Sequence, residues 1–427
     1  MPLDLPYRLG KYELTQQIGQ GATGKVYHAL DTFSGQEVAV KLVDQAVITD
    51  PMFDEGCRKQ FLNEASLAGR LAHPHVVTIL EASVTQDAGY VVMEYVSGGN
   101  LVRHTKVDGL LPIGNVLQVI FKCCGALDYA FRQGIIHRDI KPANIMVASG
   151  TDVKISDFGA AVFYSTQATQ EMGIGTPHYM SPEQISHGHL THLSDMYSLG
   201  IVSYQLLTGV RPFHAQTLHE LFDAIARKDA LPPSAQRSGL PAELDNVILR
   251  MIAKNPDDRY SNWADLALEL AEIGRFSTFR QGIPDSEKFS TLRAMNELRE
   301  FSEPEIWELV QASAWAKFPD RTVVVRENES GQSLYILASG SLKVTKQGCL
   351  LNTIKAGECF GEMAYIQRGT NRQATLEAIS DVVVAEFSFQ AMEKLSTSCK
   401  LHFERILLHS LVDRLVLAGD RIVQMHS

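Results

Sequence analysis

The chain has 427 residues, which is more than one hydrophobic core usually holds, so we expect at least two domains. Its 45% hydrophobic and 21% charged residues are typical of a globular protein, and its net charge of −10 argues against a nucleic-acid binder, which would carry a basic surface. The six scattered cysteines predict a reducing, cytoplasmic compartment. We expect no signal peptide, because the N-terminus lacks a charged region followed by an apolar stretch, and no membrane span, because no apolar run approaches about 20 residues.

The first segment, from Tyr12 to about Val43, has the pattern of strands around a glycine-rich turn. Residues 18–26 form that turn, and its three glycines let a backbone approach a phosphate group without interference from a Cβ atom. A glycine-rich hairpin without a ligand is the alternative. Val26 and the strand at residues 38–41 follow at offsets that favour phosphate binding.

Lys41 lies in an otherwise apolar strand, where an ammonium group needs a partner of opposite charge. Glu64 is the candidate, on a helix predicted from about Phe53 to Leu71. The pair would hold the α- and β-phosphates of a nucleotide. The alternative is that both charges are simply solvated.

Further strands are predicted at about Val76–Ala82 and Tyr90–Glu94, and the chain becomes mostly helical after Gly98. Two loops interrupt the helical pattern. One covers residues 136–144, and the other is a long polar loop from Asp157 to Glu183.

The loop at residues 136–144 carries the groups that phosphoryl transfer requires. Asp139 can accept a hydrogen bond from an attacking hydroxyl and align it, and Lys141 can neutralise the charge of a γ-phosphate. Asn144 and Asp157 supply hard oxygen ligands of the kind that Mg²⁺ or Mn²⁺ prefers. The loop therefore predicts an ATP- and metal-dependent phosphotransferase.

Residues from about Tyr12 to Ile273 resemble the Ser/Thr protein kinase family, especially the eukaryote-like kinases of bacteria. The motifs that carry the resemblance are the glycine-rich turn, the strand ending at Lys41, the 136–144 loop and Asp157-Phe158-Gly159. The resemblance implies a bilobal fold that transfers the ATP γ-phosphate to Ser or Thr hydroxyls of protein substrates. It implies a catalytic set of Lys41, Glu64, Asp139, Lys141 and Asn144, with Asn144 and Asp157 as metal ligands. The residues implied to bind ATP are Ile18, Gly19, Gly21, Gly24, Val26, Ala39, Lys41, Met93 (as gatekeeper), Glu94, Val96 (both in the hinge), Met146 and Asp157.

The same resemblance implies two contacts that support the catalytic loop. Glu183 is expected to pair with Arg259, and Asp195 is expected to brace the loop. Lys141 and Thr176 match the pattern of kinases that act on Ser and Thr rather than Tyr.

Arg138 precedes Asp139, and in the family this arrangement is often controlled by phosphorylation, because a buried arginine gains a partner of matching charge. We favour Thr169 as the phosphorylated residue, with Thr166 second. The alternative is an ordinary polar loop without a regulatory phosphate.

The helical periodicity lapses over residues 276–290, which we interpret as a linker between a kinase domain at 10–275 and a second domain at 291–427. Beyond it, Ser302 and Glu305 form the pattern of a capping box that opens a helix through Ser313.

Short strands with glycine-bearing turns are then predicted from Thr322 to Phe387, which suggests an antiparallel barrel or sandwich. A helix is predicted from about Phe389 to Val423. Its heptad seam could pair two copies of the chain or could cap the strands. The seam comprises Leu401, Leu408, Leu411, Leu415, Ala418 and Ile422.

In the second domain, a carboxylate, a helix start and an arginine fall close together, as a cyclic phosphodiester with a ribose requires. The amides of the helix start can bind an anion, Arg372 can bind the phosphate oxygens through both guanidinium arms, and Glu362 can accept from the ribose 2′-hydroxyl.

Residues from about Leu298 to Ile422 resemble the cyclic nucleotide-binding domain family, a β-roll flanked by helices. Gln373 departs from the family's usual small residue at a position that influences the choice of base, so cAMP and cGMP both stay open as ligands. The residues implied to bind the nucleotide are Phe360, Gly361, Glu362, Met363, Ala364, Arg372, Gln373 and Ala374.

The sequence thus predicts a multidomain α+β protein in which a bilobal kinase fold precedes a cyclic nucleotide-binding β-roll. The expected function is a Ser/Thr protein kinase that uses ATP and Mg²⁺ or Mn²⁺ and is regulated by cAMP or cGMP. One alternative keeps the active kinase and makes the roll a dimerisation or docking module that binds no nucleotide. A second treats the kinase fold as a scaffold without activity, although its catalytic residues are all present.

Overall fold

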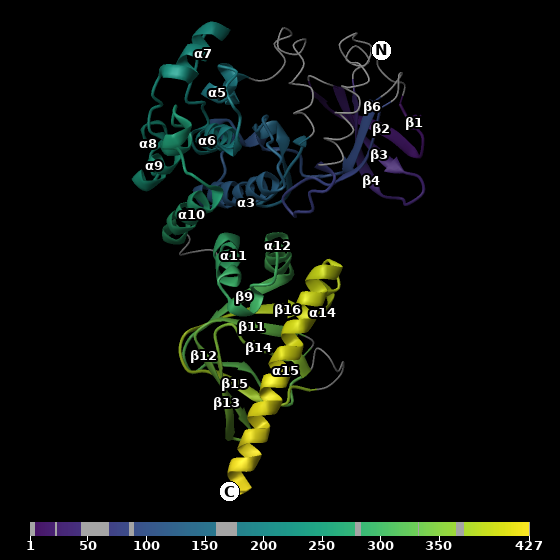
Figure 1. Cartoon of the computed structure of the whole chain (residues 1–427), viewed down its shortest axis with the longest axis vertical. Helices are drawn as coiled ribbons and strands as arrows, with labels where there is room; N and C mark the ends of the chain where they lie inside the picture. The colour runs from purple at the N-terminus through teal and green to yellow at the C-terminus, as the bar shows by residue number, and fades with distance from the viewer. Residues whose placement is uncertain are drawn as a thin grey trace. The chain divides into compact units, whose positions relative to one another are not determined.

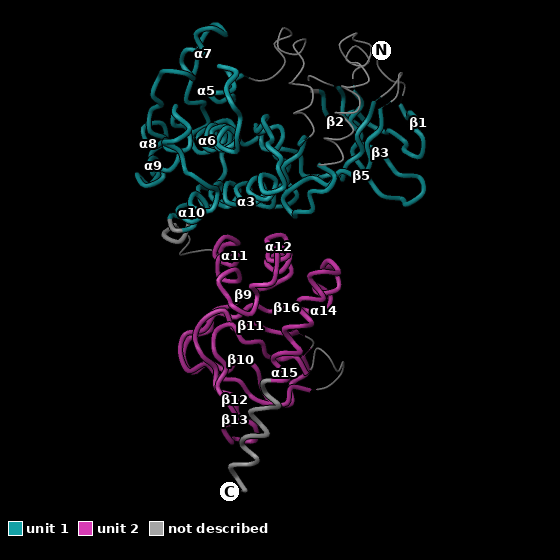
Figure 2. Tube along the Cα trace, in the orientation of Figure 1, with its two compact units in different colours: residues 1–277 teal, residues 278–427 magenta. Residues whose placement is uncertain are grey.

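The computed structural model describes residues 5–21, 24–43, 68–84, 89–158, 177–277, 283–331, 333–363 and 371–426. The chain divides into two compact units, Met1–Ser277 and Thr278–Ser427, which are coloured separately in Figure 2. Both units combine helices with β-sheet (Figure 1), so the protein has the multidomain α+β architecture that the sequence predicts. Among these residues no helix is both long enough and apolar enough to cross a bilayer.

The first part of unit 1 is a six-stranded antiparallel sheet with the order β1-β2-β3-β4-β6-β5. Successive side chains of β4 alternate between two buried clusters: Val38 and Val40 pack on one face of the sheet, and Ala39 packs on the other. Strand β1 was not predicted. The strands are β1 (Tyr7–Leu9), β2 (Tyr12–Gly21), β3 (Gly24–Asp31), β4 (Glu37–Val43), β5 (Ile79–Val84) and β6 (Gly89–Glu94).

The second part of unit 1 is mainly helical (Figure 1). Its helices are α3 (Ile113–Arg132), α5 (Pro182–Ile185), α6 (His192–Thr208), α7 (Leu218–Arg227), α8 (Pro233–Gln236), α9 (Ala242–Met251) and α10 (Trp263–Ser277). Short 3₁₀ turns join them at η1 (Leu101–His104), η2 (Val107–Gly109), η3 (Pro142–Asn144), η5 (Pro177–Tyr179) and η6 (Pro256–Asp258). The sequence does not predict the hairpin of β7 (Ile145–Ser149) and β8 (Asp152–Ile155), because each strand is too short to show a clear alternation.

Helix α6 lies at the centre of this helical core. Every residue from Ser194 to Thr208 is buried, as expected for a helix surrounded by protein on all sides. The helix starts with a capping box between Thr191 and Ser194, and it ends at Gly209, whose φ of +80° favours glycine. Helix α6 carries Asp195 near its first turn, so its position fixes the position of that carboxylate.

Unit 2 contains two four-stranded antiparallel sheets, with the orders β10-β15-β12-β13 and β14-β11-β16-β9. Leu342 and Leu376 from the first sheet and Leu337 and Val384 from the second belong to one buried cluster, so the sheets enclose a common core. The strands are β9 (Ser313–Phe318), β10 (Val323–Val325), β11 (Ser333–Ser339), β12 (Ser341–Lys346), β13 (Cys349–Lys355), β14 (Cys359–Phe360), β15 (Thr375–Ala378) and β16 (Val382–Ser388).

The helices of unit 2 are α11 (Asp285–Arg293), α12 (Glu303–Ala312), α14 (Phe389–Met392) and α15 (Thr397–His426), with a 3₁₀ turn, η7, at Asn296–Leu298. The predicted capping box between Ser302 and Glu305 opens α12. Two expectations differ from the structure. The second half of the expected 276–290 linker is helical, because α11 begins there. The expected single helix from about Phe389 is divided into α14 and α15. At the break, the Ser396 hydroxyl accepts from the Cys399 amide, which caps the start of α15.

Candidate functional sites

The catalytic loop of unit 1 gathers three side chains around one carboxylate. The Lys141 ammonium lies 2.7 Å from Asp139 Oδ2. Asn144, in turn η3, donates from Nδ2 to the Asp139 carbonyl at 2.8 Å and to Asp139 Oδ2 at 3.1 Å. Because these bonds engage the amide nitrogen of Asn144, its amide oxygen is the atom suited to a divalent cation.

Lys41 and Asp157 form an ion pair that joins the sheet to the end of β8. The ammonium lies 2.9 Å from Asp157 Oδ1, across 116 residues of sequence. Burial by itself would raise the pKa of Asp157, but the charge of Lys41 outweighs it and holds the pKa below its ordinary value. Asp157 is therefore an anion at neutral pH, as a cation ligand must be. The expected partner of Lys41, Glu64, lies outside the described residues.

Asp195 braces the catalytic loop from helix α6, as predicted. Its two carboxylate oxygens accept from the backbone amides of His137 and Arg138, each at 2.7 Å. Burial raises the pKa of Asp195, and the two amide hydrogen bonds act against that rise. The brace holds Arg138 at a φ of +65°, a conformation that arginine rarely adopts, and the Gln184 amide donates to the Arg138 carbonyl at 2.8 Å.

We expect Asp195→Asn to lower kcat by about 5- to 100-fold, because the new amide presents one oxygen and one donor to two backbone N–H groups, and an unsatisfied buried donor costs about 1–3 kcal/mol. Steady-state kinetics and thermal unfolding of the full chain measure the two consequences. Asp229→Asn, at an exposed aspartate of the same unit, is the control. Kinetics equal to those of the control would contradict a bracing role for Asp195.

An apolar cluster lies beside the Lys41–Asp157 pair. Ala39 on β4 and Met93 on β6 are buried in it, and Val26 and Met146 pack against them from opposite lobes. Strand pairing places Ala39 directly opposite Met93 and Val26 opposite Lys41. The resemblance to protein kinases implies that these four residues bind ATP, and the fold brings them together.

The Glu94 carboxylate fixes the predicted hinge, which contains Glu94 and Val96. Glu94 Oε1 accepts from the Thr78 amide at 2.8 Å and lies 2.9 Å from the Lys154 ammonium. Lys154 belongs to the hairpin that the sequence did not predict, so this contact escaped sequence reasoning. The side chain of Glu94 is therefore structural, and its backbone is the part that could bind a nucleobase.

The glycine-rich turn is described in part. Gly19 and Gly21 end β2, and Gly24 begins β3. A Cβ atom on Gly24 would lie 1.9 Å from the Leu42 carbonyl oxygen, so glycine is needed there for pairing with β4 as well as for approach to a phosphate. Ile18 is exposed.

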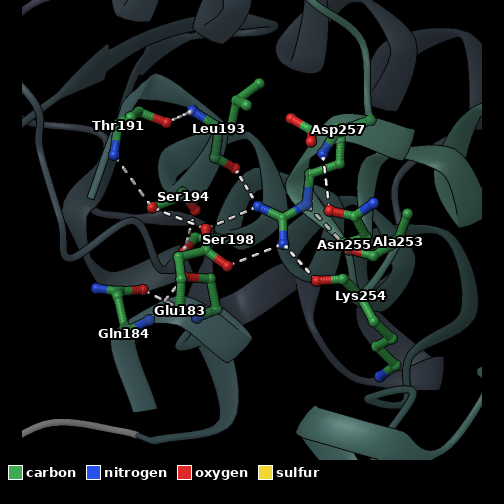
Figure 3. A network of polar contacts seen from close by, with 12 residues as sticks. Glu183, Gln184, Thr191, Leu193, Ser194, Ser198, Ala253, Lys254, Asn255 and Asp257 are labelled. Atoms are coloured by element: carbon green, nitrogen blue, oxygen red, sulfur yellow. Dashed lines mark hydrogen bonds and ion pairs between the residues drawn. The ribbon is translucent and has the colours of Figure 1, made fainter. Parts of the chain in front are cut away.

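Glu183 and Arg259 form the predicted ion pair. Figure 3 shows Glu183, Ser194 and Leu193 in the network of polar contacts to which this pair belongs. The Arg259 side chain has no exposed surface, and its two terminal nitrogens donate to the two oxygens of Glu183 at 2.8 and 3.0 Å. Burial would raise the pKa of Glu183, but the hydrogen bond and charge of Arg259 hold it below its ordinary value. Ser194, in the first turn of α6, also donates to Glu183 at 2.8 Å, so the pair connects α5 to the helix that carries Asp195.

Unit 2 holds Arg372 in a narrow slot. The side chain is buried, with the residue 6% exposed, and it donates to the carbonyls of Gly361 at 3.2 Å and Ser333 at 2.9 Å. A Cβ atom on Gly331 would lie 2.3 Å from Nε of Arg372, and one on Gly361 would lie 2.6 Å from Nη1. A side chain at either position would push the guanidinium aside, and Gly361 also has a φ of +85°, which favours glycine. The buried cation suits an anionic ligand.

The other predicted nucleotide-binding residues of unit 2 are distributed around Arg372. Phe360 and Glu362 are buried, Met363 and Gln373 are exposed, and the Gln373 amide donates to the Asn371 carbonyl at 2.9 Å. Ala374 is half-buried next to β15. Glu362 directly follows Gly361, whose carbonyl accepts from Arg372, so a buried carboxylate and a buried guanidinium come from neighbouring segments.

Several predicted residues lie outside the part of the chain that the structure describes. They are Glu64, Gly159, Thr166, Thr169, Thr176 and Ala364. The phosphorylation of Thr169 or Thr166 therefore stays a prediction. One contact that sequence reasoning missed is the packing of Tyr335 against Arg372, because the two residues approach only through the register of β11 and its neighbours.

The comparisons with known proteins agree with this division. The family model for the protein kinase domain matches residues 12–271, more than half of the chain, and the model for the cyclic nucleotide-binding domain matches residues 315–399. The serine/threonine-protein kinase PknB of Mycobacterium leprae is 36% identical over 275 residues, which cover 63% of this chain and 44% of the relative.

Two further relatives are similar in extent. PknB of Mycobacterium tuberculosis strain H37Rv is 36% identical over 292 residues, covering 66% of this chain and 46% of that protein. The probable serine/threonine-protein kinase CA_C1728 of Clostridium acetobutylicum is 33% identical over 296 residues, covering 69% of this chain and 44% of that protein. The chain thus spans less than half the length of these relatives. The chain belongs to the protein kinase family and carries a C-terminal cyclic nucleotide-binding domain.

Proposed function

We propose that the protein is a Ser/Thr protein kinase that transfers the γ-phosphate of ATP to hydroxyl groups of protein substrates. The observation that carries the proposal is the convergence of Asp139, Lys141 and Asn144 next to the Lys41–Asp157 ion pair. The similarity to bacterial Ser/Thr kinases supports it.

The residues would act in the following way. Lys141 and Asn144 both contact Oδ2 of Asp139, so Oδ1 is assigned to the substrate hydroxyl, whose proton it accepts as the oxygen–phosphorus bond forms. The bond from the γ-phosphorus to the bridging oxygen breaks, and ADP leaves with that electron pair. Lys41 would contact the α- and β-phosphates, and Lys141 would neutralise charge on the γ-phosphate. A divalent cation held by Asn144 and Asp157 would supply electrostatic stabilisation of the phosphates.

Incubation of the full chain with γ-labelled ATP, Mg²⁺ or Mn²⁺ and generic protein acceptors tests this activity. We expect label on serine or threonine of an acceptor or of the chain itself. A correctly folded protein that labels no acceptor, itself included, would contradict the proposal and favour the scaffold alternative.

We further propose that a cyclic nucleotide, cAMP or cGMP, binds unit 2 and regulates the kinase. The buried Arg372 in its glycine-lined slot supports this proposal. A regulatory effect requires the nucleotide to bind the active and inactive states of the kinase with different affinity. A kinase assay with and without each nucleotide tests it, and an unchanged rate despite measured binding would contradict regulation.

We expect Arg372→Ala to weaken cyclic nucleotide binding by at least about tenfold, because a hydrogen bond to a charged group contributes about 1.5–3 kcal/mol. Calorimetry with cAMP and with cGMP measures the change. Arg321→Ala is the control, since the side chain of Arg321 in the same unit is 88% exposed. If Arg372→Ala bound the nucleotide as tightly as this control, the assigned phosphate site would be wrong.

The absence of any heat or thermal shift with either nucleotide would favour the second candidate, in which the roll is a dimerisation module. Helix α15 exposes Leu401, Leu408 and Val412, whose exposed fractions are 55%, 62% and 55%, at a spacing that places them along one side. That apolar stripe is the observation in favour of a homodimer.

A further inference from the structure

Tyr335 lies beneath the guanidinium of Arg372. The guanidinium carbon is 5.3 Å from the centre of the tyrosine ring, within the range of a cation–π contact. Hydrogen bonds to Ser333 and Gly361 fix the two terminal nitrogens of Arg372, and the ring contacts the same group from a third direction. The orientation of this arginine is therefore set by one aromatic face and two backbone carbonyls.

Tyr335 is itself held from both neighbouring strands. Register places it opposite Phe360 on β14 and opposite Glu386 on β16. The Phe360 ring stacks on it with centroids 4.9 Å apart and an interplanar angle of 12°, and the Tyr335 hydroxyl donates to Glu386 Oε1 at 3.2 Å. Burial, together with the charge of Glu386, raises the pKa of Tyr335, so the hydroxyl stays a neutral donor at physiological pH.

These contacts form a continuous support in which Phe360 packs on Tyr335, and Tyr335 packs on Arg372. Phe360 directly precedes Gly361, whose carbonyl accepts from Arg372, so the support and the hydrogen bond come from the same short segment. An arginine that recognises a phosphate through two parallel hydrogen bonds must be held in a defined plane, because its donors diverge in fixed directions.

We propose that Tyr335 is a positioning residue that holds the Arg372 guanidinium in the plane required to bind the phosphate of a cyclic nucleotide. This inference rests on the proposed binding of cAMP or cGMP to unit 2. The aromatic face carries the effect, and the hydroxyl bond to Glu386 only orients the ring.

A double-mutant cycle in the full chain tests the inference, with cAMP and cGMP as calorimetric probes. We expect Tyr335→Leu to weaken binding about tenfold, as loss of a partly desolvated cation–π contact predicts, and Tyr335→Phe to bind within about threefold of the wild type. Arg372→Gln removes the cation, so adding Tyr335→Leu to this variant is expected to cause almost no further loss of nucleotide affinity.

If the double variant loses affinity by the product of the losses of Tyr335→Leu and Arg372→Gln, the inference is overturned. Tyr335 would then act independently of Arg372, through a general structural role or a direct contact with the ligand. A Tyr335→Leu variant that binds as the wild type would overturn it as well, while leaving the nucleotide proposal intact. If wild-type protein binds neither nucleotide, the proposed ligand class fails and the inference fails with it. Thermal unfolding of unit 2 checks each variant, and Tyr335→Met, which keeps more side-chain volume, replaces a leucine variant that does not fold.

Discussion

Replacing Asp139 with asparagine is expected to reduce kcat for phosphoryl transfer by about 10²- to 10⁴-fold, with the KM for ATP changed by less than about threefold. The asparagine has nearly the same shape, and its oxygen can still accept from Lys141 and Asn144, so the loop should keep its conformation. It cannot take the proton of the substrate hydroxyl. The loss should therefore fall on the chemical step and not on nucleotide binding.

Steady-state kinetics with a generic acceptor, accompanied by thermal unfolding, measure this effect. Asp223→Asn is the matched control, because the carboxylate of Asp223 is exposed and pairs with the exposed Arg227 one turn away on the same helix. An Asp139→Asn enzyme with the kcat of this control would mean that Asp139 does not act on the hydroxyl. A large rise in the KM for ATP would instead mean that Asp139 contributes mainly to the nucleotide site.

The second large effect concerns stability. We expect Arg259→Met to destabilise unit 1 by about 3–5 kcal/mol, because it leaves the Glu183 carboxylate without its arginine in a buried site. The substitution also removes the donors that reach the carbonyls of Ala253 and Leu193, both at 2.9 Å or less. For a unit of this size the midpoint of thermal unfolding should fall by roughly 6–20 °C.

Differential scanning calorimetry of the full chain resolves this change if the two units unfold separately. Arg227→Met is the control, since the Arg227 side chain is 81% exposed and its surface ion pair should contribute no more than about 0.5 kcal/mol. Arg259→Met combined with Glu183→Gln should be less destabilised than the single variant, because no carboxylate is then buried alone. Equal midpoints for Arg259→Met and Arg227→Met would contradict the assigned importance of the buried pair.

The sequence predicts the grouping of side chains in the 136–144 loop well because its determinants are local. Asp139, Lys141 and Asn144 lie within one short loop, so their order in the sequence almost fixes their contacts. The capping box at Ser302 and Glu305 is also a local signal, and it correctly predicts the start of α12. The glycine-rich turn is recognisable for the same reason.

Contacts between distant segments are less accessible to sequence reasoning. The pairing of Lys41 with Asp157 and the support of Arg372 by Tyr335 depend on strand register, which no local pattern specifies. The β7–β8 hairpin is too short for its alternation to be distinguished from a helix end, so the contact of Lys154 with Glu94 could not be anticipated.

Burial of helix α6 on every side has a consequence for how the catalytic loop can move. The amides of His137 and Arg138 are bound to Asp195, and that aspartate is carried by the helix with the least contact with solvent in the core of unit 1. Because the surrounding helices hold Asp195 in place, small movements of the loop leave the acceptor of these two amides where it is. We therefore expect the backbone at His137 and Arg138 to keep its conformation when more exposed parts of unit 1 move.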